Sequence, residues 1–207
     1  MVIGFIGDSI TYGVGASQPE YTYVNRVKKT LGCEVVNYGI SGTRIARQIE
    51  ITENHQCDMD FNLRLEFIDP SLDRLFVFGG TNDFGHGRTP FGEKDDTDVY
   101  TFYGAVNTLC RTLIDKLGKE KIVFLIPLKR ADTDCATNAY TGKCWKDYVE
   151  VINYYVDKYG LKKIDLFSAL PTPPFTESEF FIDGLHPNDK GYSVIAEKIC
   201  EFIKNDK

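Results

Sequence analysis

In the segment Val2-Ile3-Gly4-Phe5-Ile6-Gly7-Asp8-Ser9, a short apolar run ends abruptly in a glycine and two polar residues. Apolar runs of this length form buried strands. A strand that ends at Gly7-Asp8-Ser9 places the Ser9 hydroxyl at the carboxyl edge of a sheet, where open α/β sheets bind their ligands. Glycine, aspartate and serine are also ordinary turn residues, so this segment alone does not separate a reactive serine from a turn.

Apolar runs alternate with helical patterns along the rest of the chain. We expect strands at 2–6, 34–38, 74–78, 122–126 and 163–166, and helices at 20–32, 43–53, 99–117, 145–159 and 189–204. Residues 55–70 fit either a strand or a helix, and 84–98 and 128–144 are polar loops. Such alternation predicts a parallel sheet with helices on both faces. The chain is therefore expected to form one three-layer α/β domain over residues 1–207.

The composition and net charge of the chain argue against some classes of binding partner. The chain has 207 residues, 43% of them hydrophobic, which suits one compact domain with a full core. The formal net charge of −6 argues against nucleic acid or a stable association with an anionic membrane. Met1 leads directly into the first strand, without the pattern of a signal peptide, so we expect a cytoplasmic protein. The oligomeric state is not indicated.

The six cysteines follow no zinc-binding spacing. In a cytosolic chain most of them should be reduced. Cys135 and Cys144 share one polar loop and are the pair that an oxidising environment would join.

Polar residues follow three of the predicted strands, and an Asp-x-x-His sequence precedes the last predicted helix. Acyl transfer needs a nucleophile, a base, a carboxylate that orients the base, and donors for the oxyanion. Ser9 is the candidate nucleophile, His186 the base and Asp183 its orienting carboxylate. Asn82 offers an amide donor, and Gly39 lets its backbone N–H approach a substrate because it has no Cβ.

At these positions the chain resembles the SGNH (GDSL) hydrolase family. The resemblance runs along the whole chain in the family's order, and all four of its blocks are intact. The blocks are Gly7-Asp8-Ser9-Ile10, Asn37-Tyr38-Gly39-Ile40-Ser41-Gly42, Gly80-Thr81-Asn82-Asp83 and Asp183-Gly184-Leu185-His186-Pro187.

The resemblance implies a flavodoxin-like, doubly wound sheet of about five parallel strands. It implies ester hydrolysis through an acyl-enzyme, with Ser9, Asp183 and His186 as the catalytic residues. The oxyanion hole would comprise the Ser9 N–H, the Gly39 N–H and the Asn82 amide. No metal and no organic cofactor is implied.

Several other residues have competing interpretations. Ser41 is a nucleophile by type, but it lies between glycines, where a turn is the ordinary role, and the family has no nucleophile there. His86 and Arg130 are candidates for lining the substrate site, and solvated surface positions explain them equally well. Tyr12 could supply an apolar wall for an acyl or sugar group, and aromatic core packing is its competing interpretation.

The leading hypothesis is a serine esterase for small or medium carboxylic esters, with a small-molecule or carbohydrate ester as substrate. The polar loops at 84–98 and 128–144 favour an O-acetylated carbohydrate over a long acyl chain. The alternatives are a lysophospholipase or thioesterase type of acylhydrolase and a non-catalytic carbohydrate-binding module on the same fold. A metal-dependent hydrolase using Asp8, Asp83, Asp183 and His186 is disfavoured because the chain has only three histidines and no HxH or HExxH spacing.

Overall fold

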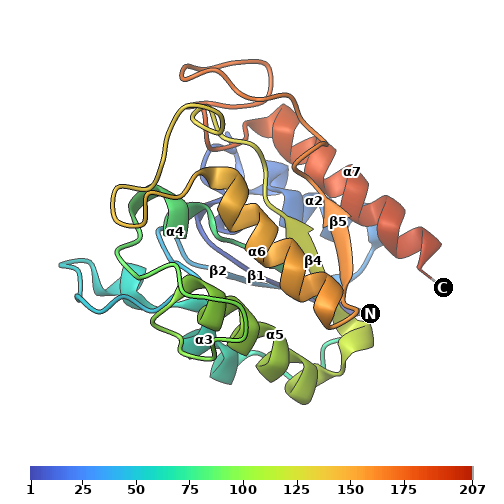
Figure 1. The fold of residues 1–207 in the computed structure, drawn as a ribbon. Coiled ribbons are helices and arrows are strands. Elements are labelled where there is room, and N and C mark those ends of the chain that lie inside the picture. Colours follow the sequence, from blue (N-terminus) through green and yellow to red (C-terminus); the bar gives the residue numbers. More distant parts are fainter. Residues whose placement is uncertain (207) are drawn as a thin grey trace.

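The protein is described by a computed structural model, which covers residues 1–206. Five parallel strands form one sheet in the order β2-β1-β3-β4-β5, the doubly wound arrangement of flavodoxin-like folds (Figure 1). The strands are β1 (Val2–Gly7), β2 (Glu34–Gly39), β3 (Arg74–Phe78), β4 (Ile122–Ile126) and β5 (Lys162–Asp165). The predicted parallel sheet of five strands is confirmed.

Helices cover both faces of this sheet. They are α1 (Ser9–Tyr12), α2 (Tyr23–Leu31), α3 (Phe61–Arg64), α4 (Thr81–His86), α5 (Phe102–Leu117), α6 (Trp145–Lys158) and α7 (Asp189–Asn205). Helices α2 and α7 pack together on one face, and α3, α5 and α6 lie on the other (Figure 1). In residues 1–206 none of these helices has the length and apolar character that crossing a membrane requires.

Alternate residues of the central strands point into two separate cores. Leu75 and Val77 face the core under α5 and α6, while Phe76 and Phe78 face the core under α2 and α7. Because both faces of the sheet are covered, these strands read as continuous apolar runs rather than as alternating ones. These apolar runs are the reason that the predicted positions of the strands agree with the structure.

The chain between the second strand and α3 differs from expectation. The predicted helix over 43–53 is absent, and residues 40–54 form an irregular loop. The N–H groups of Ile45 and Ala46 donate instead to the buried carboxylate of Asp83, at 2.9 and 2.8 Å, and the N–H of Arg47 donates to the carbonyl of Val99. These long-range partners take the N–H groups that a helix would use internally.

Other boundaries shift by a few residues. Helix α2 begins at Tyr23 rather than at residue 20 because Pro19–Tyr21 forms a separate 3-10 turn and Thr22 caps the helix. Thr101 likewise caps α5, which therefore begins at Phe102. The ambiguous stretch 55–70 contains two 3-10 turns and the single helical turn α3.

A buried guanidinium connects the carboxyl ends of β1 and β2. Arg64 is 3% exposed. It donates to the carbonyls of Tyr38 and Gly7 and, at 3.0 Å, to the hydroxyl of Thr43. One side chain therefore joins two strand ends and the loop that follows β2.

The carboxylate of Asp8 fixes the turn between β1 and α1. Its Oδ1 accepts the N–H of Ile10 at 3.0 Å, which caps α1 directly beside Ser9. Burial raises the pKa of Asp8 to about 6, although the Ile10 N–H and the charges of His186 and Arg64 oppose this shift. The folded protein therefore favours the protonated form of Asp8 more than the unfolded chain does.

Replacing Arg64 with methionine should lower the free energy of unfolding by about 2–4 kcal/mol, because its hydrogen bonds to the two strand ends and to Thr43 are lost. Chemical denaturation measures this loss. Arg111→Met is the matched control, since Arg111 is exposed on α5 and its replacement should change little. Equal stabilities of the two variants would contradict the connecting role of Arg64.

The pKa of Asp8 predicts a pH dependence of stability. A carboxyl whose folded pKa is raised stabilises the protein below its unfolded pKa, and this contribution is lost as the pH rises through the folded value of about 6. Between pH 4 and pH 7 the wild type should lose about 3 kcal/mol more than Asp8→Asn, which keeps the capping oxygen but cannot ionise. Denaturation curves at both pH values test this, and equal losses in the two proteins would contradict it.

Candidate functional site

The carboxyl ends of the strands gather the predicted site residues at one edge of the sheet. Ser9 follows β1 as the first residue of α1 and is 7% exposed. Asn82 lies in the first turn of α4, directly after β3. Asp183 and His186 come from the loop before α7, which packs beside α2. The loops that follow β4 and β5 lie at the same end of the molecule (Figure 1).

Ser9, His186 and Asp183 form one hydrogen-bonded chain. The Oγ of Ser9 lies 3.0 Å from the Nε2 of His186, and the Nδ1 of His186 lies 2.7 Å from the Oδ2 of Asp183. A carboxylate accepts only, so Nδ1 carries the hydrogen and Nε2 is free to accept from the serine hydroxyl. The residues are thus in the arrangement that lets an imidazole remove a proton from a serine.

The loop geometry keeps Asp183 ionised. Its Oδ1 accepts the N–H groups of Leu185 and His186, at 3.0 and 2.7 Å, while Oδ2 holds the imidazole. Partial burial raises the pKa of Asp183, but these hydrogen bonds and the charge of His186 outweigh burial, so the net pKa is lowered. The carboxylate is therefore charged near neutral pH and orients His186.

The Asn82 amide is held on both sides. Its Nδ2 donates to the carbonyl of Thr43 at 2.9 Å, and its Oδ1 lies 3.0 Å from the Nε2 of His86. An amide nitrogen has two hydrogens, so one N–H remains for a ligand. Thr43 also contacts Arg64, which bonds the end of β1, and this places the Asn82 amide close to the Ser9 turn.

The N–H of Gly39, which we expected to face a substrate, donates to a side chain of the protein in this structure. Its N–H donates to the Oδ1 of Asn37 at 2.8 Å, and the Asn37 amide in turn donates to the carbonyl of Thr11. A Cβ on Gly39 would come within 2.4 Å of the backbone nitrogen of Tyr12. Glycine is needed here because α1 packs directly against the end of β2, and its N–H is occupied in this structure.

The backbone N–H of Ser9 donates to no acceptor within residues 1–206. In the loop after β2, the N–H groups of Ser41, Gly42 and Arg44 likewise donate to no acceptor in that part of the chain. Gly42 adopts φ +77 and precedes Thr43, whose carbonyl accepts from Asn82.

The three residues expected to line the site have different surroundings. Arg130 forms two hydrogen bonds with Asp132 and also donates to the backbone and hydroxyl of Thr81, so its guanidinium braces the loop after β4. Tyr12 is 63% exposed on α1. His86 borders a groove of about 290 Å³, lined by polar and small residues: Gly85, His86, Gly87, Arg88, Asn138, Ala139 and Tyr140. Their contact with a substrate stays a prediction.

The loop 128–144 is anchored from within. The amide of the buried Asn138 donates to the carbonyls of Asp83, Phe84 and Gly87, which joins this loop to α4. Cys135 and Cys144 carry free thiols in this structure. This part of the site is therefore a rim held by hydrogen bonds to α4.

The residues proposed for a metal site do not gather. Asp8 and Asp83 accept backbone N–H groups from their own turn and from the loop after β2, and His186 contacts Ser9 and Asp183. Within residues 1–206, no three His, Cys, Asp or Glu side chains are grouped as a metal ion would require.

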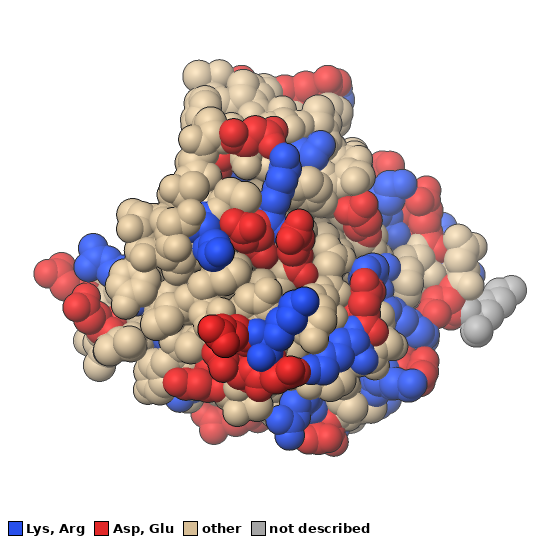
Figure 2. All heavy atoms as spheres, viewed as in Figure 1, with Lys and Arg blue, Asp and Glu red and all other residues tan. Residues whose placement is uncertain are grey.

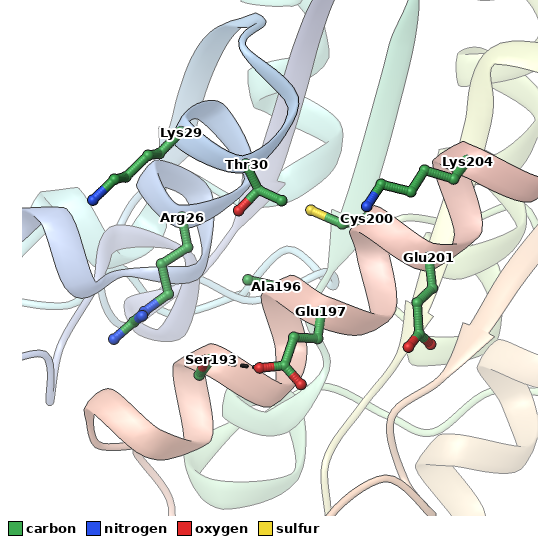
Figure 3. Close-up of a pocket in the computed structure, with 9 residues that line it drawn as sticks. All are labelled: Arg26, Lys29, Thr30, Ser193, Ala196, Glu197, Cys200, Glu201 and Lys204. Atoms are coloured by element: carbon green, nitrogen blue, oxygen red, sulfur yellow. Dashed lines mark hydrogen bonds between the residues drawn. The ribbon is translucent and has the colours of Figure 1, made fainter.

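The groove between α2 and α7 and the charges on the face that carries α5 and α6 do not indicate a second functional site. Figure 3 shows a groove of about 580 Å³ between α2 and α7, where acidic and basic side chains alternate and none belongs to the Ser9 site. Acidic and basic side chains are also interspersed over the face that carries α5 and α6 (Figure 2). No single-sign patch marks a nucleic-acid surface on this face.

Comparisons with known proteins agree with this geometry. The model of the GDSL-like lipase/acylhydrolase family matches residues 5–194. No curated protein matches the chain by sequence. A solved structure of a protein from Lactobacillus plantarum is 27% identical and superposes with a TM-score of 0.80 over 98% of this chain and 96% of its own.

Two further solved structures share the fold. The lipase/acylhydrolase from Enterococcus faecalis is 25% identical, with a TM-score of 0.67 over 99% of this chain and 95% of its own. Est24, a carbohydrate acetylesterase from Sinorhizobium meliloti, is 14% identical, with a TM-score of 0.70 over 99% of this chain and 98% of its own. A family match that spans nearly the whole chain, together with the Ser9–His186–Asp183 arrangement, shows that the chain belongs to the GDSL-like lipase/acylhydrolase family.

Proposed function

We propose that the protein is a serine esterase that hydrolyses small carboxylic esters of polar alcohols through an acyl-enzyme on Ser9. The observation that carries this proposal is the hydrogen-bonded chain from Ser9 through His186 to Asp183. A serine hydroxyl is a weak nucleophile until an adjacent base removes its proton, and this chain supplies the base and the group that orients it.

In the first half of the reaction the Oγ of Ser9 bonds to the ester carbonyl carbon while His186 Nε2 takes the hydroxyl proton. The π electrons of the carbonyl move onto its oxygen, giving an oxyanion. When the intermediate collapses, the bond to the alcohol oxygen breaks, and His186 returns the proton to that oxygen. Asp183 stays ionised throughout and stabilises the imidazolium that forms in between.

In the second half water replaces the alcohol. His186 takes a proton from the water as its oxygen attacks the acyl carbon, and the proton then passes to the Oγ of Ser9. The acid leaves and the serine hydroxyl is restored, so the two halves together add one water across the ester bond.

The oxyanion would be held by the Ser9 N–H and the free N–H of the Asn82 amide. The Gly39 N–H, at the end of β2 beside α1, stays the third donor that we propose, and in this structure it also donates to the side chain of Asn37. Fixed donors of this kind stabilise the transition state because they need no reorganisation when charge develops.

Polar surroundings support a small acyl group and a polar alcohol. The polar loops at 84–98 and 128–144 favour a small acyl group over a long chain. The groove of about 290 Å³ that His86 borders has Arg88 and Tyr140 in its lining, and these polar groups suit a hydroxylated alcohol such as an O-acetylated sugar. A lysophospholipase or long-chain thioesterase would need an apolar channel.

Hydrolysis of p-nitrophenyl esters from acetate to decanoate tests the proposal. The wild type should hydrolyse the acetate fastest, and Ser9→Ala should lose at least about a thousandfold in turnover because the nucleophile is gone. A fluorophosphonate should add covalently to the wild type and not to Ser9→Ala. Ser41→Ala is the matched control for the other serine at this edge and should behave as the wild type. Unchanged hydrolysis by Ser9→Ala would overturn the serine mechanism, and a preference for decanoate would overturn the short acyl group.

Asn82→Ala should lower kcat by roughly two to three orders of magnitude, because one oxyanion donor is removed, with little change in KM. The variant should remain folded, since the side chain makes only two hydrogen bonds. Steady-state kinetics on the acetate ester and a thermal melt together measure both effects. Near wild-type turnover in a folded variant would remove Asn82 from the site.

A further inference from the structure

His86 contacts Asn82 from the next turn of the same helix. The two residues are four positions apart on α4, so they lie on one face of it. The Nε2 of His86 lies 3.0 Å from the Asn82 Oδ1, and the Nδ1 of His86 lies 2.5 Å from the Nη2 of Arg44. A guanidinium, an imidazole and an amide thus form a continuous hydrogen-bonded chain that ends at the proposed oxyanion donor.

The direction of every hydrogen bond in this chain follows from the groups at its two ends. The carbonyl of Thr43 can only accept, so the Asn82 nitrogen faces it and the amide oxygen faces His86. That oxygen can only accept, so the Nε2 of His86 carries a hydrogen. A guanidinium can only donate, so the Nδ1 of His86 is unprotonated and the ring is neutral.

Arg44 has little else to bind. The residue is 6% exposed, and among residues 1–206 its Nε and Nη1 have no hydrogen-bond partner. The charge of Arg44 acts on the buried Asp83, where it opposes the rise to about 7 that burial gives the pKa of that carboxyl. The hydrogen bond from Arg44 to His86 is therefore the directed contact that this buried charge makes.

We propose that His86, held as the neutral Nε2–H tautomer by Arg44, is a positioning residue that keeps the Asn82 amide turned with its N–H toward the oxyanion. The inference rests on the proposed function, because it assigns His86 a role through the oxyanion donor Asn82. A flipped amide would set its oxygen against the Thr43 carbonyl and toward the developing negative charge. His86 and Thr43 together exclude that orientation.

Burial and nearby charge also favour the neutral ring. Burial of the imidazole, together with the nearby charges of Arg44 and Arg130, lowers the pKa of His86 well below its ordinary value. A protonated ring would point a second N–H at the Arg44 guanidinium, donor against donor. The hydrogen bond that Asn82 receives at its oxygen also polarises the amide and strengthens its remaining N–H as a donor.

Kinetics of His86→Leu and His86→Gln on the acetate ester test the role. The leucine variant should lose roughly tenfold or more in kcat with KM changed less than about twofold, since the donor remains but is no longer oriented. Glutamine can donate to the Asn82 oxygen and accept from Arg44, so this variant should recover most of the lost turnover. His55→Gln, at a histidine whose side chain is 83% exposed, is the matched control and should equal the wild type.

A double-mutant cycle separates positioning from general damage. In an Asn82→Ala background the His86→Leu replacement should cause no further loss of kcat, because there is no amide left to orient. Wild-type kcat in His86→Leu, or the same loss in both backgrounds, would overturn the inference. If the wild type itself shows no hydrolysis that depends on Ser9, the proposed function fails, which is a different result from Ser9-dependent hydrolysis that ignores His86.

A spectroscopic measurement tests the chain without any assay of activity. Nitrogen-15 spectra of the histidine rings of the wild-type protein at pH 7 should show one ring as the neutral Nε2–H tautomer, and the signal should disappear in His86→Gln. In Arg44→Met the Nε2 should keep its hydrogen, because the Asn82 oxygen still accepts it, but the pKa of the ring should rise, because the nearby positive charge is gone. A cationic or Nδ1–H ring at position 86 in the wild type would overturn the inference even if the leucine variant does not fold.

Discussion

The guanidinium of Arg64 is the contact on which the geometry of this edge depends. It donates to carbonyls at the ends of β1 and β2 and to a hydroxyl in the loop between β2 and α3, so one buried group joins these three segments. The loop that it fixes carries Thr43, and Thr43 in turn fixes the Asn82 amide. The buried guanidinium of Arg64 therefore links the end of β1, next to the Ser9 turn, to the loop that holds Asn82. It contacts neither Ser9 nor Asn82 itself.

The site has two halves that are held in different ways. Ser9, His186 and Asp183 form a chain whose base sits in a short loop and is oriented by a carboxylate that two backbone N–H groups keep charged. The Asn82 half is held by buried groups, with Asp83 binding the loop after β2 and Asn138 binding α4 to the rim. The two halves therefore differ in burial at their outer ends, because the Asp183 side chain is 47% exposed whereas Asn82 and Asp83 are buried.

The sequence predicted the sheet and the grouping of Ser9, His186 and Asp183, for physical reasons. Strands buried on both faces are continuous apolar runs, and Ser9, Asn82 and Asp183 with His186 punctuate segments that end at one edge of the sheet. The helix expected over 43–53 failed because Asp83, 37 and 38 residues away, takes the N–H groups of Ala46 and Ile45. The occupied N–H of Gly39 and the contacts of His86 likewise depend on partners that no local pattern reveals.

The hydrogen bond between Ser9 and His186 joins residues 177 positions apart. Helix α7 completes that approach: the Tyr192 hydroxyl donates to the carbonyls of Ile10 and Val14, and Asp189 accepts from Ser17. The contact between Ser9 and His186 therefore joins the first strand to the segment before the last helix. A protein cut before Asp183 would keep the Ser9 turn without the imidazole that contacts it.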